Sequence, residues 1–174
     1  MAEPSLEQFK AAVLPHLDAA YNLARWLTRH KHDAQDIVQD AYLRAWKAFG
    51  EFHGGDSRAW LLTIVRNACY SWHRFNRRHE TEPMPDEDDS IVGSDAWDPA
   101  ALLLQRVDAQ TVRQAIDQMP PEFREVLVLR ELEGLSYKQV AAVIGAPMGT
   151  VMSRLARARA RLQELLLERM PEEA

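Results

Sequence analysis

The sequence of 174 residues lacks the features that mark several protein classes. Its single cysteine, Cys69, excludes an intramolecular disulfide and any zinc site built from several cysteines. No apolar run approaches the ~18 residues that span a bilayer, and the N-terminus lacks a basic stretch followed by an apolar core. We therefore expect a soluble cytoplasmic protein without membrane insertion, in which Cys69 is a buried thiol rather than a redox sensor.

Signatures of catalysis are also missing. No paired carboxylates, activated nucleophile or glycine-rich phosphate loop is evident. His30 and His32 are the only close pair of histidines, and no Glu or Cys spacing completes a metal-ligand set around them. We predict a protein that is not an enzyme and holds no metal or cofactor. The alternative, a helical enzyme or metalloprotein, would use the histidines of the chain, which are His16, His30, His32, His53, His73 and His79.

Charge is distributed unevenly along a chain whose formal net charge is -5. Residues 80–98 carry eight acidic side chains and no Lys or Arg. Low apolar content, Pro83, Pro85 and repulsion between like charges argue against a packed element there. Arginines gather just before this segment. A second basic stretch, residues 145–162, holds four arginines and no carboxylate. The pattern predicts two basic surfaces on either side of an acidic flexible linker.

Helical periodicity dominates on both sides of the acidic segment, and neither strand alternation nor an internal repeat is present. The sequence therefore predicts an all-α protein of two small helical domains, with boundaries at 1–79 and 105–174 and a linker at 80–104. In the N-terminal domain, Asp33 is the expected start of a second helix and Asp56 or Ser57 the expected cap of a third. The buried stripes are predicted to be Phe9, Val13, Leu17, Ala20, Ala24 and Leu27; then Ile37, Ala41, Ala45 and Ala48; and then Leu61, Ile64, Val65, Ala68, Trp72 and Phe75.

A helix-turn-helix is predicted between Ser136 and Leu162. Ser136 and Gln139 have the spacing of a capping box, which opens a short helix, and residues 145–147 read Gly-Ala-Pro, a tight turn. The second helix has a narrow apolar stripe, Val151, Leu155, Ala158 and Leu162. Its opposite side has small side chains that would let the backbone approach a major groove, with arginines at the flanks where phosphates would lie. The expected DNA-contacting residues are Ser136, Thr150, Met152, Ser153, Arg154, Ala156, Arg157, Arg159 and Arg161.

These segments carry a family resemblance. The run PPEFREVLVLRELEGLSYKQVAAVIGAPMGTVMSRLARARARL resembles the promoter-reading C-terminal domain of bacterial sigma factors of the extracytoplasmic-function type. The runs DAQDIVQDAYLRAWKAF and FHGGDSRAWLLTIVRNACYSWHRFNRRH resemble the N-terminal domain of the same family. Pro147 and Met152 depart from the pattern, because members typically have a serine-like cap and a basic or polar residue at these positions. The resemblance implies a subunit that directs core RNA polymerase to promoters, and an anti-sigma factor as a further partner.

The resemblance also assigns surfaces to the N-terminal domain. It implies that the helix beginning near Asp33 docks on the clamp helices of the large polymerase subunit. Away from the core stripe, this helix has an apolar centre rimmed by polar and charged residues, as partner-binding patches do. The expected polymerase-binding residues are Asp36, Gln39, Asp40, Leu43, Trp46 and Lys47. A purely structural alternative packs Leu43 and Trp46 against the first helix.

The third helix is expected to bind single-stranded DNA. Arginines on its exposed face would follow the phosphate backbone, while an aromatic ring and an amide would contact an unstacked base. The resemblance implies that the glycine-containing loop before this helix captures bases flipped during promoter melting. The residues expected to act here are Phe52, His53, Asp56, Ser57, Arg58, Arg66, Asn67, Tyr70, Arg74 and Arg77. Trp72 is expected in the core, while Trp60 fits either a core or a base-stacking position.

Two further interpretations stay open. The chain could be a transcription regulator that binds DNA without polymerase, with its N-terminal helices as a dimerisation or effector module. The basic C-terminal helix could also be no more than a solvated charged surface. Tight binding of the purified chain to a palindromic duplex would favour the regulator.

Overall fold

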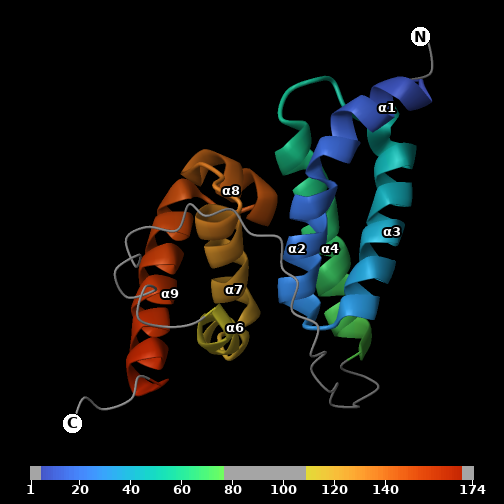
Figure 1. Cartoon of the computed structure of the whole chain (residues 1–174). Helices are drawn as coiled ribbons and strands as arrows, with labels where there is room; N and C mark the ends of the chain where they lie inside the picture. Colours follow the sequence, from blue (N-terminus) through green and yellow to red (C-terminus); the bar gives the residue numbers. More distant parts are fainter. Residues whose placement is uncertain (1–4, 77–108, 170–174) are drawn as a thin grey trace. The chain divides into compact units, whose positions relative to one another are not determined.

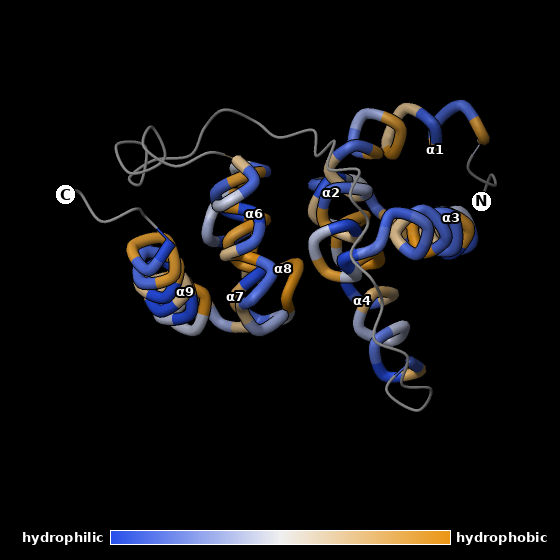
Figure 2. The backbone as a smooth tube through the Cα atoms, turned by 60° about the horizontal axis from the view of Figure 1, so that its bottom comes forward, coloured by the Kyte–Doolittle hydropathy of each residue, from blue (hydrophilic) through white to orange (hydrophobic). Residues whose placement is uncertain are grey.

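The computed structural model describes residues 5–76 and 109–169, which form an N-terminal and a C-terminal helical unit (Figure 1). The described residues contain helices and no strand, so the prediction of an all-α fold with two helical regions is confirmed. Each helix carries both hydrophobic and hydrophilic residues, as expected of amphipathic helices (Figure 2). The expected linker at 80–104 and both predicted domain boundaries lie outside the described residues.

The N-terminal unit is built on three long helices that pack against one another, α2, α3 and α4 (Figure 1). A shorter helix, α1, contacts α4 and places Phe9 against aromatic side chains of α3. Single 3₁₀ turns, η1 and η2, follow α1 and α3. The bounds are α1 Leu6–Val13, η1 Leu14–His16, α2 Leu17–Thr28, α3 Lys31–Ala48, η2 Phe49–Glu51 and α4 Ser57–Asn76.

The first predicted stripe is divided between two helices. Pro15 lies in η1, where its ring and missing N–H prevent a continuous α-helix from Leu6 to Thr28. Leu17, at the start of α2, is consequently half-buried. The remaining members of the stripe are buried as predicted, namely Phe9, Val13, Ala20, Ala24 and Leu27.

The start of α3 corrects the prediction that the helix begins at Asp33. The helix begins at Lys31 with His30 as its N-cap, because Arg29 takes a left-handed conformation (φ 68°) that ends α2 and reverses the chain. Asp33 lies in the first turn of α3, where a carboxylate interacts favourably with the helix dipole. The core positions Ile37, Ala41 and Ala45 are buried, while Ala48 is half-buried.

The beginning of α4 is capped by Asp56, since its Oδ1 accepts a hydrogen bond of 3.0 Å from the backbone N–H of Ala59. Leu61, Val65 and Ala68 are buried as predicted, and Cys69 is fully buried. Ile64 and Trp72 are only half-buried.

Phe75 was predicted in the core and is 65% exposed, so that prediction is wrong. His73 Nε2 lies 2.5 Å from the carbonyl oxygen of Leu27, next to Thr28 at the C-terminal end of α2. The last turn of α4 therefore extends past the helix against which it packs. Periodicity alone gives no sign of this, because it does not report where a neighbouring helix ends.

The C-terminal unit packs α6 (Ala109–Asp117) and α7 (Pro121–Leu127) against the long helix α9 (Met148–Arg169) (Figure 1). Pro120 is the N-cap of α7 and Pro121 its first residue, a position where the missing N–H of proline is tolerated. After α7 the chain widens into a π-helical segment, η3 (Val128–Leu132).

The helix-turn-helix is confirmed. Ser136 and Gln139 form the predicted capping box, with both reciprocal hydrogen bonds present, at the start of α8 (Tyr137–Ile144). Gly145 ends α8 in a left-handed conformation (φ 68°), which glycine adopts at little cost. Ala146 and Pro147 then lead directly into α9.

Candidate functional site

Helix α9 has one buried and one exposed face. The predicted apolar stripe is buried in full, and Leu165 and Leu166 extend it toward the C-terminal end of the helix. The opposite face, predicted to enter a DNA groove, is exposed at Met152, Ser153, Ala156 and Arg157, and also at Ala160.

At 100° per residue, the exposed face has a definite order. Its centre is a row of short side chains, Gly149, Ser153, Ala156 and Ala160, which we call the small-residue row. Met152 and, one turn earlier, Met148 lie along one edge of the row, and Arg157 lies along the other. The backbone of this face is therefore accessible to a large partner.

Gly149 has no packing reason to be glycine. A Cβ atom built there meets nothing within 4 Å, and no positive φ angle is recorded for this residue. Glycine in a helix is less stable than alanine by up to about 1 kcal/mol. The absence of a side chain therefore costs stability without a benefit inside the chain, which points to a benefit outside it.

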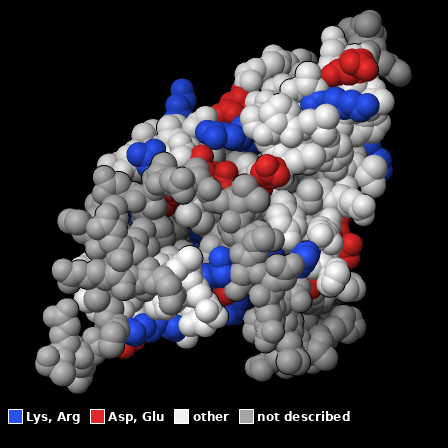
Figure 3. Space-filling model, viewed as in Figure 1, with Lys and Arg blue, Asp and Glu red and all other residues white. Residues whose placement is uncertain are grey.

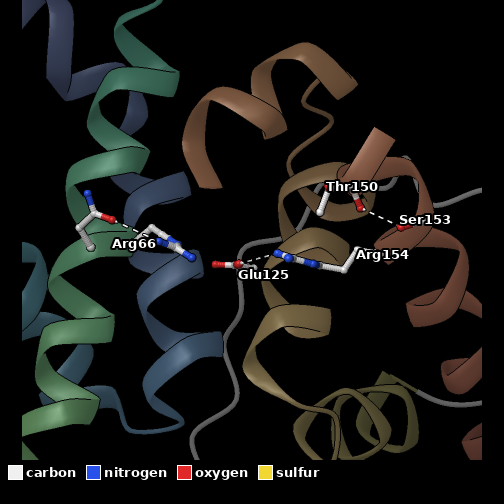
Figure 4. Close-up of polar contacts among 6 residues, drawn as sticks. Arg66, Glu125, Thr150, Ser153 and Arg154 are labelled. Atoms are coloured by element: carbon white, nitrogen blue, oxygen red, sulfur yellow. Dashed lines mark hydrogen bonds and ion pairs between the residues drawn. The ribbon is translucent and has the colours of Figure 1, made fainter. Parts of the chain in front are cut away.

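The four arginines predicted near DNA have different surroundings. Arg154 points toward the buried carboxylate of Glu125 at 3.9 Å, and Ser153 Oγ donates a 3.3 Å hydrogen bond to the carbonyl oxygen of Thr150 (Figure 4). Arg161 pairs with exposed Glu164 at 3.0 Å. Arg157 has no hydrogen bond or ion pair with any residue in the described part of the chain. Arg157 is thus the arginine that the fold leaves available to a ligand.

Arg159 is held by the protein itself. Its Nε donates a 2.5 Å hydrogen bond to Oε1 of Glu131, whose side chain is 5% exposed, and its Nη2 contacts the same oxygen. Partial burial acts to lower the pKa of Arg159, but the hydrogen bond and charge of Glu131 and the hydrogen bond with Tyr137 outweigh it, so this pKa is raised. The ring of Tyr137 is covered by the guanidinium of Arg130, which donates to the carbonyl oxygen of Leu135. These contacts tie η3, α8 and α9 together.

The α3 surface predicted to bind polymerase is exposed at all of its positions, Asp36, Gln39, Asp40, Leu43, Trp46 and Lys47. Leu43 is 61% exposed and Trp46 is 41% exposed. Trp46 also meets Phe9 of α1 edge to face, with ring centroids 5.2 Å apart. The alternative in which both residues pack against the first helix therefore holds for one side of Trp46 but not for Leu43. Asp40 is paired with Arg44 at 2.8 Å.

On α4, the predicted single-strand surface contains a compact cluster. The guanidinium of Arg66 lies 4.1 Å from the ring centroid of Tyr70, and its Nη1 donates to Oδ1 of exposed Asn67 at 3.3 Å. Arg74, one turn further on, donates to Ser71. The structure thus brings the cation, amide and ring together, whereas Arg77 lies outside the described residues.

The loop before α4 is fixed by aromatic packing. Phe52 lies 4.9 Å from Trp60 and 6.0 Å from Phe49 between ring centroids, so half-buried Trp60 belongs to an aromatic cluster. His53 is exposed beside Gly54 and Gly55, both at positive φ. The loop therefore presents polar residues on an aromatic base.

His16, the last residue of η1 and the N-cap of α2, contacts the start of α4. Its Nε2 lies 3.3 Å from Oγ of Ser57, another predicted DNA contact. Burial lowers the pKa of His16, the positive charge of Arg58 lowers it further, and Asp56 opposes both. Asp56, which caps α4, and Ser57, which contacts His16, thus have structural roles at the start of α4.

Sequence reasoning missed Glu131, Glu125, His16 and Gly149. Glu125 lies in α7 and Glu131 in η3, and only the fold reveals that both are buried opposite arginines. The described residues hold no group of three or more metal-ligating side chains. No helix among them has the length and hydropathy to cross a membrane.

Comparisons with known proteins agree with this geometry. The family model for sigma-70 region 2 matches residues 12–79, and the model for sigma-70 region 4 matches residues 109–162. The ECF RNA polymerase sigma factor SigE of Mycolicibacterium smegmatis is 32% identical over 99% of this chain, which spans 66% of that relative. The ECF RNA polymerase sigma factor EcfG of Rhodopseudomonas palustris is 36% identical over 93% of this chain and 85% of its own length.

Among solved structures, the sigma factor RpoE of Bartonella quintana, in complex with the anti-sigma factor NepR, is similar to this chain. The TM-score is 0.77 at 32% identity, covering 93% of this chain and 98% of that one. Both helical units thus match in sequence and in fold. The chain belongs to the sigma-70 family of RNA polymerase sigma factors, in its ECF group.

Proposed function

We propose that the chain is a promoter-specificity subunit of RNA polymerase. The α3 surface recruits the core enzyme, the α4 face binds the melted strand, and the exposed face of α9 contacts the distal promoter element in the major groove. RNA synthesis belongs to polymerase, and this chain supplies recognition. The observation that carries the proposal is the helix-turn-helix of α8 and α9 with its exposed small-residue row and one available arginine, Arg157.

The α3 surface supports recruitment by polymerase. Leu43 and Trp46 form an exposed apolar centre, and the acids Asp36 and Asp40 beside them suit a basic partner. A single exposed leucine is common on protein surfaces, but Leu43 and Trp46 are three residues apart on α3 and therefore form a contiguous exposed apolar patch.

The α4 cluster supports strand capture. Tyr70 offers a ring already covered by a cation, and exposed Asn67 offers hydrogen-bonding groups to a base edge. A flipped base costs a few kcal/mol to extrude, so a surface that accepts it favours strand opening without ATP.

The surface charge explains why polymerase would be needed. On the face drawn in Figure 3, basic side chains of the described residues lie in separate groups with acidic side chains among them. Non-specific DNA affinity depends on the number of phosphates neutralised, so such a surface binds duplex weakly. Held on polymerase, the two units would act at high effective concentration, which makes paired weak contacts specific.

Run-off transcription with core polymerase on a genomic promoter library tests the proposal. We expect initiation at defined sites that depends on this chain and is lost in a Leu43→Asp variant. The control variant Leu167→Asp changes an equally exposed leucine on α9 and should initiate normally. Initiation at the same sites without the chain would contradict the proposal. Tight binding to a palindromic duplex without polymerase would instead support a regulator.

We also propose that the chain has an anti-sigma factor as a partner. The similar RpoE structure was solved in complex with the anti-sigma factor NepR. The same exposed apolar residues that suit polymerase, Leu43 and Trp46, would suit an inhibitor that covers them. Competition between such a protein and core polymerase for the chain would test this point.

A further inference from the structure

We infer that Met148 and Met152 select thymine in the distal promoter element, through apolar contact with the C5-methyl group that thymine presents in the major groove. The inference rests on the proposed function and specifies which base chemistry the α9 face selects.

The two methionines form one exposed apolar edge. Met152 is 54% exposed and Met148 is 46% exposed. Because they are four residues apart on α9, their side chains lie one above the other on the same face. Within the described part of the C-terminal unit, Leu167 is the one other large apolar side chain of this exposure, and it lies near the opposite end of the helix.

The surroundings of this edge suit DNA. The methionines border the small-residue row, and Arg157 borders its other side. No carboxylate occurs between residues 148 and 162, so this half of α9 presents apolar side chains, arginines and the hydroxyls of Thr150 and Ser153, with no negative charge. A ligand that suits such a face carries negative charges with apolar groups close beside them. A duplex offers both, as phosphates along the groove and methyl groups on its floor.

Thymine is the base that fits a methionine. In the major groove the other bases present hydrogen-bond donors or acceptors alone, whereas thymine adds a methyl group. A thioether has no donor and is a weak acceptor, so covering a polar base edge with it leaves that edge unsatisfied. The methionine side chain is also unbranched and polarizable, so it can follow the outline of a methyl group.

The expected discrimination is modest and measurable. Burial of one methyl group corresponds to about fourfold in affinity, so two methyl groups correspond to about fifteenfold. Deoxyuridine isolates this contribution, because it differs from thymidine only by that methyl group and keeps the same base pairing.

The experiment uses holoenzyme reconstituted from the full chain and core polymerase. A promoter fragment found by run-off transcription is synthesised with deoxyuridine in place of each distal-element thymidine in turn, and affinities are measured by competition at fixed salt. For the natural chain we expect deoxyuridine to lower the affinity of the holoenzyme about fourfold at one or two positions. In Met152→Ala the loss at one of these positions should vanish, while Met152→Leu should keep it. Leu167→Ala is the matched control and should behave as the natural chain does.

Equal affinity for thymidine and deoxyuridine at every position would overturn the inference. So would a distal element without thymine, or a thymidine preference unchanged in both Met148→Ala and Met152→Ala. Failure of the proposed function looks different, because the holoenzyme would then show no promoter-dependent initiation on the thymidine fragment. Circular dichroism verifies that the variants fold.

Discussion

Gly149 shows how a single residue separates stability from function. Gly149→Ala adds a Cβ atom in open space, so we expect the C-terminal unit to gain about 0.5 kcal/mol in unfolding free energy. The same methyl group would obstruct approach of the DNA backbone and weaken binding to the distal element. Urea unfolding followed by circular dichroism and holoenzyme binding measure the two effects.

Gly134→Ala is the control for this prediction. Gly134 has φ 70°, so alanine there is strained and should destabilise the unit by about 1 kcal/mol. A loss of stability in Gly149→Ala would contradict the expected gain, and an unchanged DNA affinity would show that this glycine has no role in DNA approach.

Arg157 is the second test at the residue scale. It has no polar partner within the described residues, so its removal should leave stability within about 0.5 kcal/mol. If it contacts a base in bidentate fashion, Arg157→Ala should cost about 1–3 kcal/mol at one promoter position. Affinities for a set of single-base promoter variants would reveal this. An equal loss on every sequence would identify a phosphate contact instead.

At the scale of elements, the Glu131–Arg159 pair fixes α9 against η3. Removing Arg159 leaves a buried carboxylate without its partner, and because Arg159 is 34% exposed we discount the cost of a fully buried pair to about 2 kcal/mol. We expect Arg159→Ala to destabilise the C-terminal unit by this amount and to leave the salt dependence of DNA binding unchanged. Urea unfolding and DNA titrations at several salt concentrations measure both.

Arg161→Ala provides the comparison, since its pair with Glu164 is exposed and should contribute less than about 0.5 kcal/mol. Should Arg159→Ala reduce the salt slope by about one while stability is retained, the phosphate contact predicted from sequence would be supported.

The contact between His16 of η1 and Ser57 of α4 should depend on pH. Unfolded His16 takes up a proton near its ordinary pKa of about 6.5, whereas the folded unit resists protonation because this pKa is lowered. The contribution of His16 to the unfolding free energy of the N-terminal unit is therefore fully present above pH ~6.5. It is lost as the pH falls below that value toward the lowered pKa.

Four of the five tryptophans, Trp26, Trp46, Trp60 and Trp72, lie in the N-terminal unit and none lies between 109 and 174. Fluorescence during urea unfolding should show a midpoint that decreases between pH 7 and pH 5, and His16→Gln should flatten this decrease. His32→Gln, at an exposed position, should leave it unchanged. An identical pH profile in His16→Gln would show that other groups control it.

At the scale of the whole molecule, the acidic segment offers a test of how the units cooperate. From the family resemblance we propose that this segment acts near the polymerase active site, where its negative charge would occupy basic surfaces meant for nucleic acid. Replacing Asp86, Glu87, Asp88 and Asp89 by their amides should lower the ratio of abortive to full-length transcripts. Amide substitutions at the exposed acids Asp18 and Glu122 are the control. An unchanged ratio in the amide variant would exclude this role.

The sequence by itself determined the all-α class, the capping box, the turn at Gly145 and the buried stripe of α9, because local periodicity and capping chemistry specify each of them. It also determined which α9 face is exposed, since the buried stripe leaves one opposite side. Only the tertiary structure decided that α3 begins at Lys31, that Phe75 is exposed, and that Arg159 pairs with Glu131. Each of these depends on where a second element ends or which side chain it presents, and a one-dimensional pattern carries no information about the neighbour that a residue meets in space.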